Sequence, residues 1–202
     1  MLDADPIPHR PRWMRTERQK GATAVEFALL AVLFFTLVFG ILEIARLIYL
    51  FNTLQEVTRR AAALAINSPF DADSQRSIRE RAMLTDTRGR LVLGAPVTPA
   101  HLQLEYLSLA RTNAGTLATP RVINLPADPA ANRVNCLIDP YGANCIRFVR
   151  VRVCQPGGEG DCDPVPYQML FPFIDLSDLT LPRSETILPA QSLGFTGALP
   201  AI

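Results

Sequence analysis

A long apolar segment near the N-terminus constrains this chain more than any other feature of its sequence. Residues 22–42 carry a single charge, on Glu26. A helix over this segment would be about 32 Å long, enough to cross a bilayer core of roughly 30 Å. A carboxylate inside such a helix costs on the order of 3 kcal/mol, so Glu26 needs a partner or a function.

The residues that precede the apolar segment are basic. Their positive or titratable side chains are His9, Arg10, Arg12, Arg15, Arg18 and Lys20. Basic residues beside a membrane-spanning helix stay on the cytoplasmic side. We therefore expect a cytoplasmic leader over residues 1–21, a transmembrane helix over 22–45 and an exported remainder. The net charge of +1 gives no global field that would attract nucleic acid.

Two other interpretations of the apolar segment have to be weighed. A cleaved secretory signal has a shorter apolar core, followed closely by a small-x-small site. Residues 61–63 resemble such a site, but charged residues from Glu43 to Arg60 separate them from the apolar segment. An unprocessed single-pass anchor explains the length and the basic flank, and it leaves Gly21 and Glu26 without a role.

The helix is expected to continue beyond the membrane over residues 46–66. Glu43 and Arg46 stand three residues apart, and Glu56 stands three and four residues before two arginines. These spacings place opposite charges on one helix face. Residues 67–69, Asn-Ser-Pro, then end the helix.

Residues 67–202 are expected to form a β-rich head. Most of the 17 prolines lie after residue 95, which argues against a helical bundle. Residues 102–106 and 149–153 alternate with the period of half-buried strands, and the second run should turn its arginines to solvent. The fold class is therefore α+β: a long N-terminal membrane-spanning helix followed by a small head with an antiparallel sheet.

Further elements of the head are expected from local signals. Asp73 or Ser74 is expected to cap a short helix that runs through Leu84. Residues 91–93 are typical of the start of a strand. A last strand over residues 179–188 contains a proline and should therefore lie at a sheet edge.

Four cysteines fall in the head, at Cys136, Cys145, Cys154 and Cys162. An oxidising compartment favours two disulfides, and four cysteines allow three pairings. If residues 146–153 form one continuous strand, Cys145 and Cys154 lie about 30 Å apart, too far for a disulfide.

Two pairings then remain, and we favour Cys136–Cys145 with Cys154–Cys162. The turn residues Pro140-Tyr141-Gly142 and Pro156-Gly157-Gly158 suit the short loops that this pairing closes.

No catalytic, cofactor or metal site is expected. The sequence has no G-x-S-x-G, Walker A or H-E-x-x-H motif. The cysteines form no C-x-x-C pair, which makes zinc binding unexpected. Asp71-Ala72-Asp73 lacks the glycine and the glutamate that a calcium loop needs at its sixth and twelfth positions. His101 is interpreted as structural.

The junction between the basic leader and the apolar helix resembles that of the TadE-like family of tight-adherence, Flp-type pilus systems. Gly21, Ala22 and Glu26 match the processing and fifth-residue positions of that family, and residues 25–29 resemble its V-E-F-A-L core. Weaker likenesses to its closing segment lie at residues 169–173, 181–182 and 190–194.

This resemblance implies a minor pseudopilin, cut between Gly21 and Ala22 by a prepilin peptidase and assembled through its N-terminal helix. Its partners would be other pilins or pseudopilins, the pilus assembly machinery and inner-membrane lipid. The major Flp pilin is very short, so the large head indicates a minor subunit with its head in the bacterial periplasm. The alternative is an unprocessed, membrane-anchored periplasmic adaptor.

Overall fold

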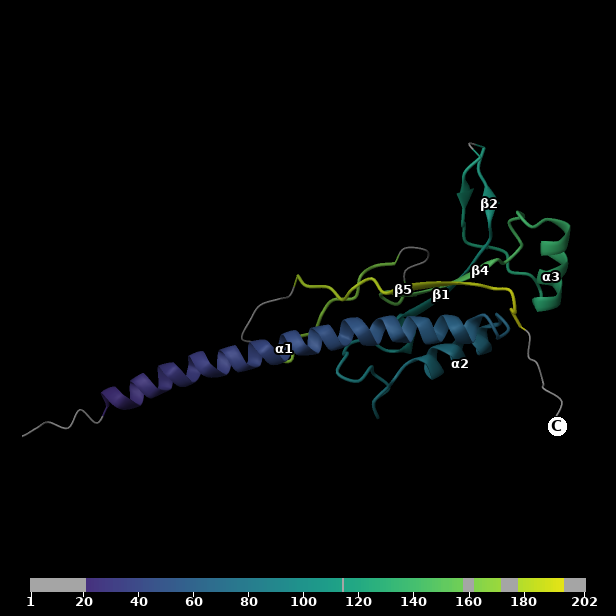
Figure 1. The fold of residues 1–202 in the computed structure, drawn as a ribbon. Helices are drawn as coiled ribbons and strands as arrows, with labels where there is room; N and C mark the ends of the chain where they lie inside the picture. The colour runs from purple at the N-terminus through teal and green to yellow at the C-terminus, as the bar shows by residue number, and fades with distance from the viewer. Residues whose placement is uncertain (1–20, 114, 158–161, 172–177, 195–202) are drawn as a thin grey trace, which may run out of the picture. The chain divides into compact units, whose positions relative to one another are not determined.

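The structure is a computed structural model that describes residues 21–113, 115–157, 162–171 and 178–194 (Figure 1). Of the described residues, 21–40 form one unit and those from Ile41 onward form a second. Helix α1, Ala22–Ala65, contributes to both units. This long helix and the antiparallel sheet that follows it confirm the expected α+β class. The basic leader, apart from Gly21, lies outside the described residues.

The sheet of the second unit has three antiparallel strands in the order β1-β4-β5. Strand β1 is Leu102–Leu107, β4 is Phe148–Val153 and β5 is Glu185–Pro189. The central strand β4 separates two strands that lie far apart in the sequence. A separate hairpin, β2 Ala110–Arg111 with β3 Leu117–Ala118, projects from the sheet in Figure 1.

One face of the sheet and the C-terminal half of α1 form the core. Val149, Val151 and Val153 of β4 are at most 2 % exposed. The buried residues of α1 recur at helical spacing along one stripe: Leu50, Leu54, Val57, Thr58, Ala61, Ala62 and Ala65. A hydrogen bond of 3.0 Å between the hydroxyls of Thr58 and Thr186 joins α1 to β5. Helix and sheet therefore share one apolar layer.

The opposite face of the sheet is more buried than its sequence indicates. Glu105 is 2 % exposed and accepts hydrogen bonds from Arg150 Nε at 2.6 Å and from Arg152 Nη2 at 2.7 Å. The two arginines lie on the face opposite the core valines, as expected, but they are only partly exposed, with 24 % of the Arg150 side chain and 15 % of the Arg152 side chain accessible. Cross-strand register places Glu105 opposite Arg150, so the ion pairs form on the sheet itself.

Three short helices complete the described fold: α2 Ala72–Ala82, the 3₁₀ turn η1 Pro99–His101 and α3 Pro129–Ile138. The expected helix after residue 73 is present, but its cap is Asp71, whose carboxylate accepts from the Ser74 amide at 2.9 Å. Helix α3 was not expected. Its signal is Asp128 followed by Pro129, an N-cap residue and a proline suited to the first helical turn.

Two strand expectations need correction. Residues 91–93 form a turn with an isolated bridge between Thr85 and Leu91, because Leu93 takes a left-handed φ of 56°. The last strand is the shorter β5, and the proline at 182 precedes it. Its position at the sheet edge agrees with the expectation, since β5 pairs with β4 alone in the described sheet.

Candidate functional site

The N-terminal stretch of α1 carries the residues that the sequence singles out. The helix begins at Ala22, directly after Gly21, and the amide of Val25 donates to the Gly21 carbonyl at 3.2 Å. A side-chain Cβ at Gly21 would meet no described atom within 4 Å. Packing within the described chain therefore does not require glycine at this position.

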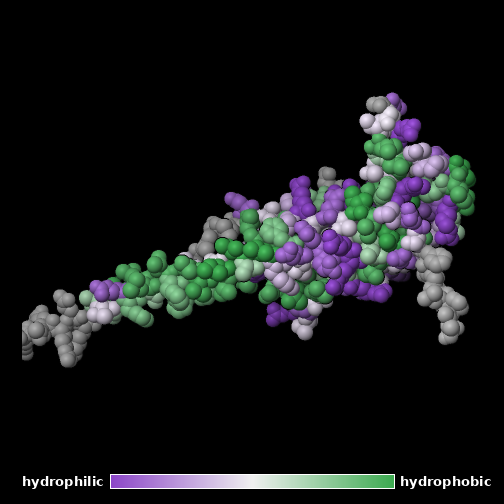
Figure 2. Space-filling model, viewed as in Figure 1, coloured by the Kyte–Doolittle hydropathy of each residue, from purple (hydrophilic) through white to green (hydrophobic). Residues whose placement is uncertain are grey.

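Glu26 lies one turn into this helix and is exposed. The apolar side chains of the same unit are also exposed: Val25, Phe27, Leu29, Leu30, Val32, Leu33, Phe34, Phe35 and Leu37. Figure 2 shows this apolar surface as a continuous green stretch. By length and composition α1 can cross a membrane, and it indicates a single-pass anchor. The exposed apolar surface of this stretch suits contact with lipid or with other apolar helices. Glu26 is the one carboxylate on that surface that requires a partner.

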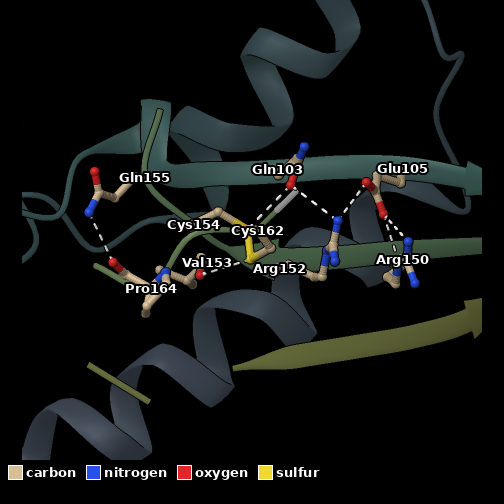
Figure 3. The surroundings of a disulfide bond; sticks show 9 residues. All are labelled: Gln103, Glu105, Arg150, Arg152, Val153, Cys154, Gln155, Cys162 and Pro164. Atoms are coloured by element: carbon tan, nitrogen blue, oxygen red, sulfur yellow. Dashed lines mark hydrogen bonds and ion pairs between the residues drawn. A yellow bond between two sulfur atoms is a disulfide. The ribbon is translucent and has the colours of Figure 1, made fainter. Parts of the chain in front are cut away.

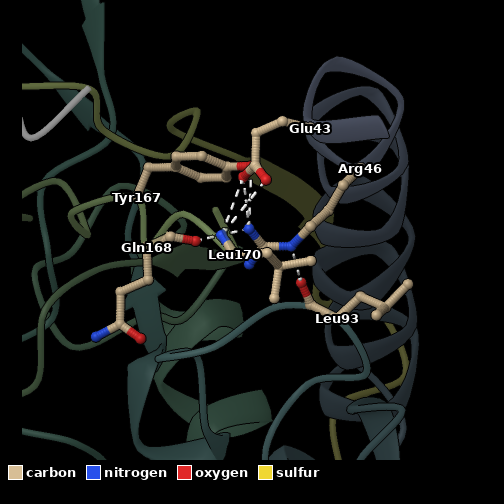
Figure 4. Close-up of polar contacts among 6 residues, drawn as sticks. All are labelled: Glu43, Arg46, Leu93, Tyr167, Gln168 and Leu170. Carbon is tan, nitrogen blue, oxygen red and sulfur yellow. Dashed lines mark hydrogen bonds and ion pairs between the residues drawn. The ribbon is translucent and has the colours of Figure 1, made fainter. Parts of the chain in front are cut away.

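A second polar feature of α1 lies inside the second unit, where Glu43 and Arg46 are each 6 % exposed. The two side chains form an ion pair of 2.9 Å, which confirms the expected common helix face. The Glu43 carboxylate also accepts a short hydrogen bond from the Tyr167 hydroxyl. The backbone amide of Leu170 lies 3.4 Å from both carboxylate oxygens. Glu43 thus binds a segment more than 120 residues further along the chain (Figure 4).

Arg46 binds two loops of the head at once. Its Nε donates to the Leu93 carbonyl at 2.7 Å, and its Nη1 donates to the Gln168 carbonyl at 2.6 Å. The guanidinium carbon lies 5.0 Å from the centroid of the Tyr167 ring, a cation–π distance (Figure 4). The left-handed turn at Leu93 therefore has a use, because its carbonyl is an acceptor for Arg46.

Tyr167 is held as a hydrogen-bond donor. Burial and the hydrogen bond to Glu43 raise the pKa of Tyr167 to about 12, so the phenol stays protonated at neutral pH. The Glu43, Arg46 and Tyr167 side chains, which we call the α1 clamp, fasten the helix to the loops at residues 93 and 167–170. Sequence reasoning identified the charge pair but missed Tyr167, which no local pattern connects to residue 43.

The four cysteines lie in two pairs at disulfide distance. The Cα atoms of Cys136 and Cys145 are 4.8 Å apart, and those of Cys154 and Cys162 are 4.9 Å apart. These are the two pairs that the sequence favours. In Figure 3 the second pair lies beside the side chains of Gln103 and Arg152, at the end of the polar sheet face.

Non-reducing peptide mapping of the exported protein should recover the links Cys136–Cys145 and Cys154–Cys162. Each link closes a loop of roughly ten residues, so replacing either pair by alanine should lower the free energy of unfolding by about 2–3 kcal/mol. Chemical denaturation of the full chain in detergent, with and without reductant, measures this change. Free thiols at all four positions, or a Cys145–Cys154 link, would contradict the pairing.

The chemistry of the described residues is that of packing and ion pairing. Over the ranges that the structure describes, no group of three His, Cys, Asp or Glu side chains is placed to hold a metal ion. His101 accepts from the Thr98 amide through Nδ1 at 3.1 Å. Burial lowers the pKa of His101, and the neutral ring completes the 3₁₀ turn.

Comparison with known proteins agrees with the resemblance drawn from the junction. Residues 21–63 match the family model described as TadE-like protein. The match begins at Gly21, includes Glu26 and the Glu43–Arg46 pair, and ends within the last turn of α1. The resemblance to the TadE-like family is thereby confirmed over these residues, and the family suggests a role in Tad pilus assembly. No curated protein and no solved structure matches the chain.

Proposed function

Starting from a TadE-like helix over residues 21–63, we propose that this protein is a minor pseudopilin of a tight-adherence, Flp-type pilus. A prepilin peptidase cuts it between Gly21 and Ala22 at the cytoplasmic face of the inner membrane. The remaining chain joins other pilins through α1, with residues 67–202 in the periplasm as the head. The protein acts by assembly and carries out no catalysis of its own.

One observation carries this proposal: Glu26 is the single charged residue in the apolar stretch of α1 over residues 22–42, which begins directly after Gly21. Cleavage at Gly21 creates a positive amine on Ala22, four residues before Glu26. Inside a bundle of helices the carboxylate of one subunit can face the amine of its neighbour. The pair then resolves two charges that would each be costly alone in an apolar setting.

The environment of Gly21 supports recognition by a peptidase. A Cβ at this position meets no described atom, and no left-handed backbone angle calls for glycine. A requirement for glycine would therefore come from an outside partner that needs close access to the backbone. The basic leader before it supports a cytoplasmic N-terminus.

Intact mass and N-terminal sequencing of the membrane-extracted protein test the proposal. In cells with a prepilin peptidase, the mature protein should begin at Ala22, and Gly21→Trp should leave the full precursor. Gly40→Leu is the matched control, because Gly40 likewise has no described atom near its Cβ position, and it should still be cut. A wild-type protein that keeps its leader in these cells would favour the static membrane-anchored adaptor instead.

A further inference from the structure

Helix α3 carries its apolar side chains on the outside. Val134 is 53 % exposed, Leu137 85 % and Ile138 79 %, whereas the buried residue of the helix is the polar Asn132. The Asn132 side chain accepts from the Ile146 amide at 2.8 Å and donates to the Ile146 carbonyl at 3.3 Å. A surface helix normally has the reverse arrangement, with apolar residues inward. Figure 2 shows hydrophobic residues on the surface of the region that carries α3.

A groove with a cavity volume of about 560 Å³ adjoins this face. Leu137 of α3, Phe148 at the start of β4 and Pro189 at the end of β5 give it apolar walls. Arg133 and Arg147 also line it, and both are exposed. Neither arginine forms an ion pair with a described residue, and the lining of the groove contains no carboxylate. The groove thus combines apolar walls with two unmatched positive charges.

The helix is held firmly in this orientation. Asp128 caps its first turn by accepting from the Ala131 amide at 2.7 Å, and Pro129 pre-sets the first helical backbone angle. Cys136 lies at disulfide distance from Cys145, next to the residue that Asn132 binds. A surface that is ordered before binding loses little conformational freedom when a partner docks, which favours affinity.

We propose that α3 and the adjoining groove bind a segment of another protein that presents apolar side chains flanked by carboxylates. Apolar anchors fill the groove against Leu137 and Phe148 and extend over the exposed Ile138 of α3. The carboxylates pair with Arg133 and Arg147. This surface belongs to the head and is additional to assembly through α1. It therefore gives the protein a second, independent interface.

The positive charge and the shape of the groove favour an acidic protein segment over two other occupants, a second copy of the chain and a bilayer surface. Two copies of the chain docked through the same face would bring their unmatched arginines together, and like charges across an interface oppose association. A bilayer surface is flat and would leave a groove of this volume unfilled. A protruding protein segment with acidic flanks satisfies both the shape and the charge.

Panning a library of random dodecapeptides against the purified full chain in detergent tests the proposal. Peptides that join Leu, Ile, Met or Phe to Asp or Glu should be enriched. Their affinity should fall about tenfold or more on Leu137→Ser with Ile138→Ser, and also on Arg133→Ser with Arg147→Ser. Leu84→Ser, at a side chain 44 % exposed beyond the end of α2, is the matched control and should bind as the wild type does.

A photo-crosslinking residue at position 138 identifies the occupant directly. Irradiation with the enriched peptide should give a peptide adduct, located by mass spectrometry. The same crosslinker in nanodisc-embedded protein reports whether lipid or a second copy lies there instead. Three outcomes would overturn the proposal. They are a failure to enrich acidic, apolar peptides, wild-type peptide affinity in both double-serine variants, and adducts with lipid or a second copy alone.

Discussion

Replacing Arg46 by methionine is expected to destabilise the folded head by about 3–5 kcal/mol, because it leaves the Glu43 carboxylate buried without its cation. The same change removes donors to the carbonyls of Leu93 and Gln168. Methionine keeps much of the volume of the arginine stem, so the loss reports the ion pair and its hydrogen bonds more than packing. Chemical denaturation of the full chain in detergent, followed by near-ultraviolet circular dichroism, measures the change.

Helix α1 offers a matched control in its second ion pair. Arg60 and Glu56 also form a salt bridge, at 2.8 Å, but their side chains are 46 % and 47 % exposed. Exposed pairs contribute up to about 1 kcal/mol, so Arg60→Met should change stability much less than Arg46→Met. Adding Glu43→Gln to Arg46→Met should recover part of the loss, since it removes the unpaired charge. Equal effects of Arg46→Met and Arg60→Met would show that burial does not govern the α1 clamp.

Glu26→Gln is expected to insert into the membrane and to be cleaved normally, yet to fail in joining other pilins. The proposed partner of Glu26 is the Ala22 amine of a neighbouring subunit, and glutamine cannot neutralise it. Subunits displaced along the helix axis would leave both charges unmatched, so the pair sets the register of assembly as well as adding stability. Co-purification with pilin partners and counting of pili by electron microscopy measure the result.

Two substitutions make the Glu26 experiment specific. Glu26→Asp keeps the charge and should retain part of the assembly. Glu56→Gln removes a carboxylate from an exposed pair on the same helix and should assemble as the wild type does. Normal pili and normal co-purification in the Glu26→Gln protein would refute the register role, and they would indicate a carboxylate that is simply hydrated at the headgroup boundary.

Local patterns in the sequence were sufficient to predict the elements in which apolar residues form a continuous run or recur at a regular spacing. The apolar run after Gly21 predicted the long helix, and alternation over residues 149–153 predicted the central strand with its valines on one face. The likeness to TadE-like proteins was visible from Gly21, Ala22 and Glu26, together with the basic leader and the V-E-F-A-L core at residues 25–29. The short spacings between cysteines also favoured the two pairs that the structure brings to disulfide distance.

Alternation did not predict which polar residues are buried. Glu105 has the pattern of a solvent-facing strand residue, but cross-strand register brings two arginines onto it, so that Glu105 is buried and the arginines are partly buried. The sequence also did not predict the outward apolar face of α3. The orientation of this helix depends on the side-chain amide of Asn132, which binds the backbone of Ile146.

The sequence by itself determined the elements that depend on neighbours a few residues away: the apolar helix, the alternating strand and the short spacings between paired cysteines. Tertiary structure decided the α1 clamp, in which Glu43 and Arg46 meet Tyr167 from a distant loop. It also decided the burial of Glu105 and the left-handed turn at Leu93. The physical reason is that a buried charge is tolerated only where partners from other segments surround it, and the chain acquires those partners when it folds.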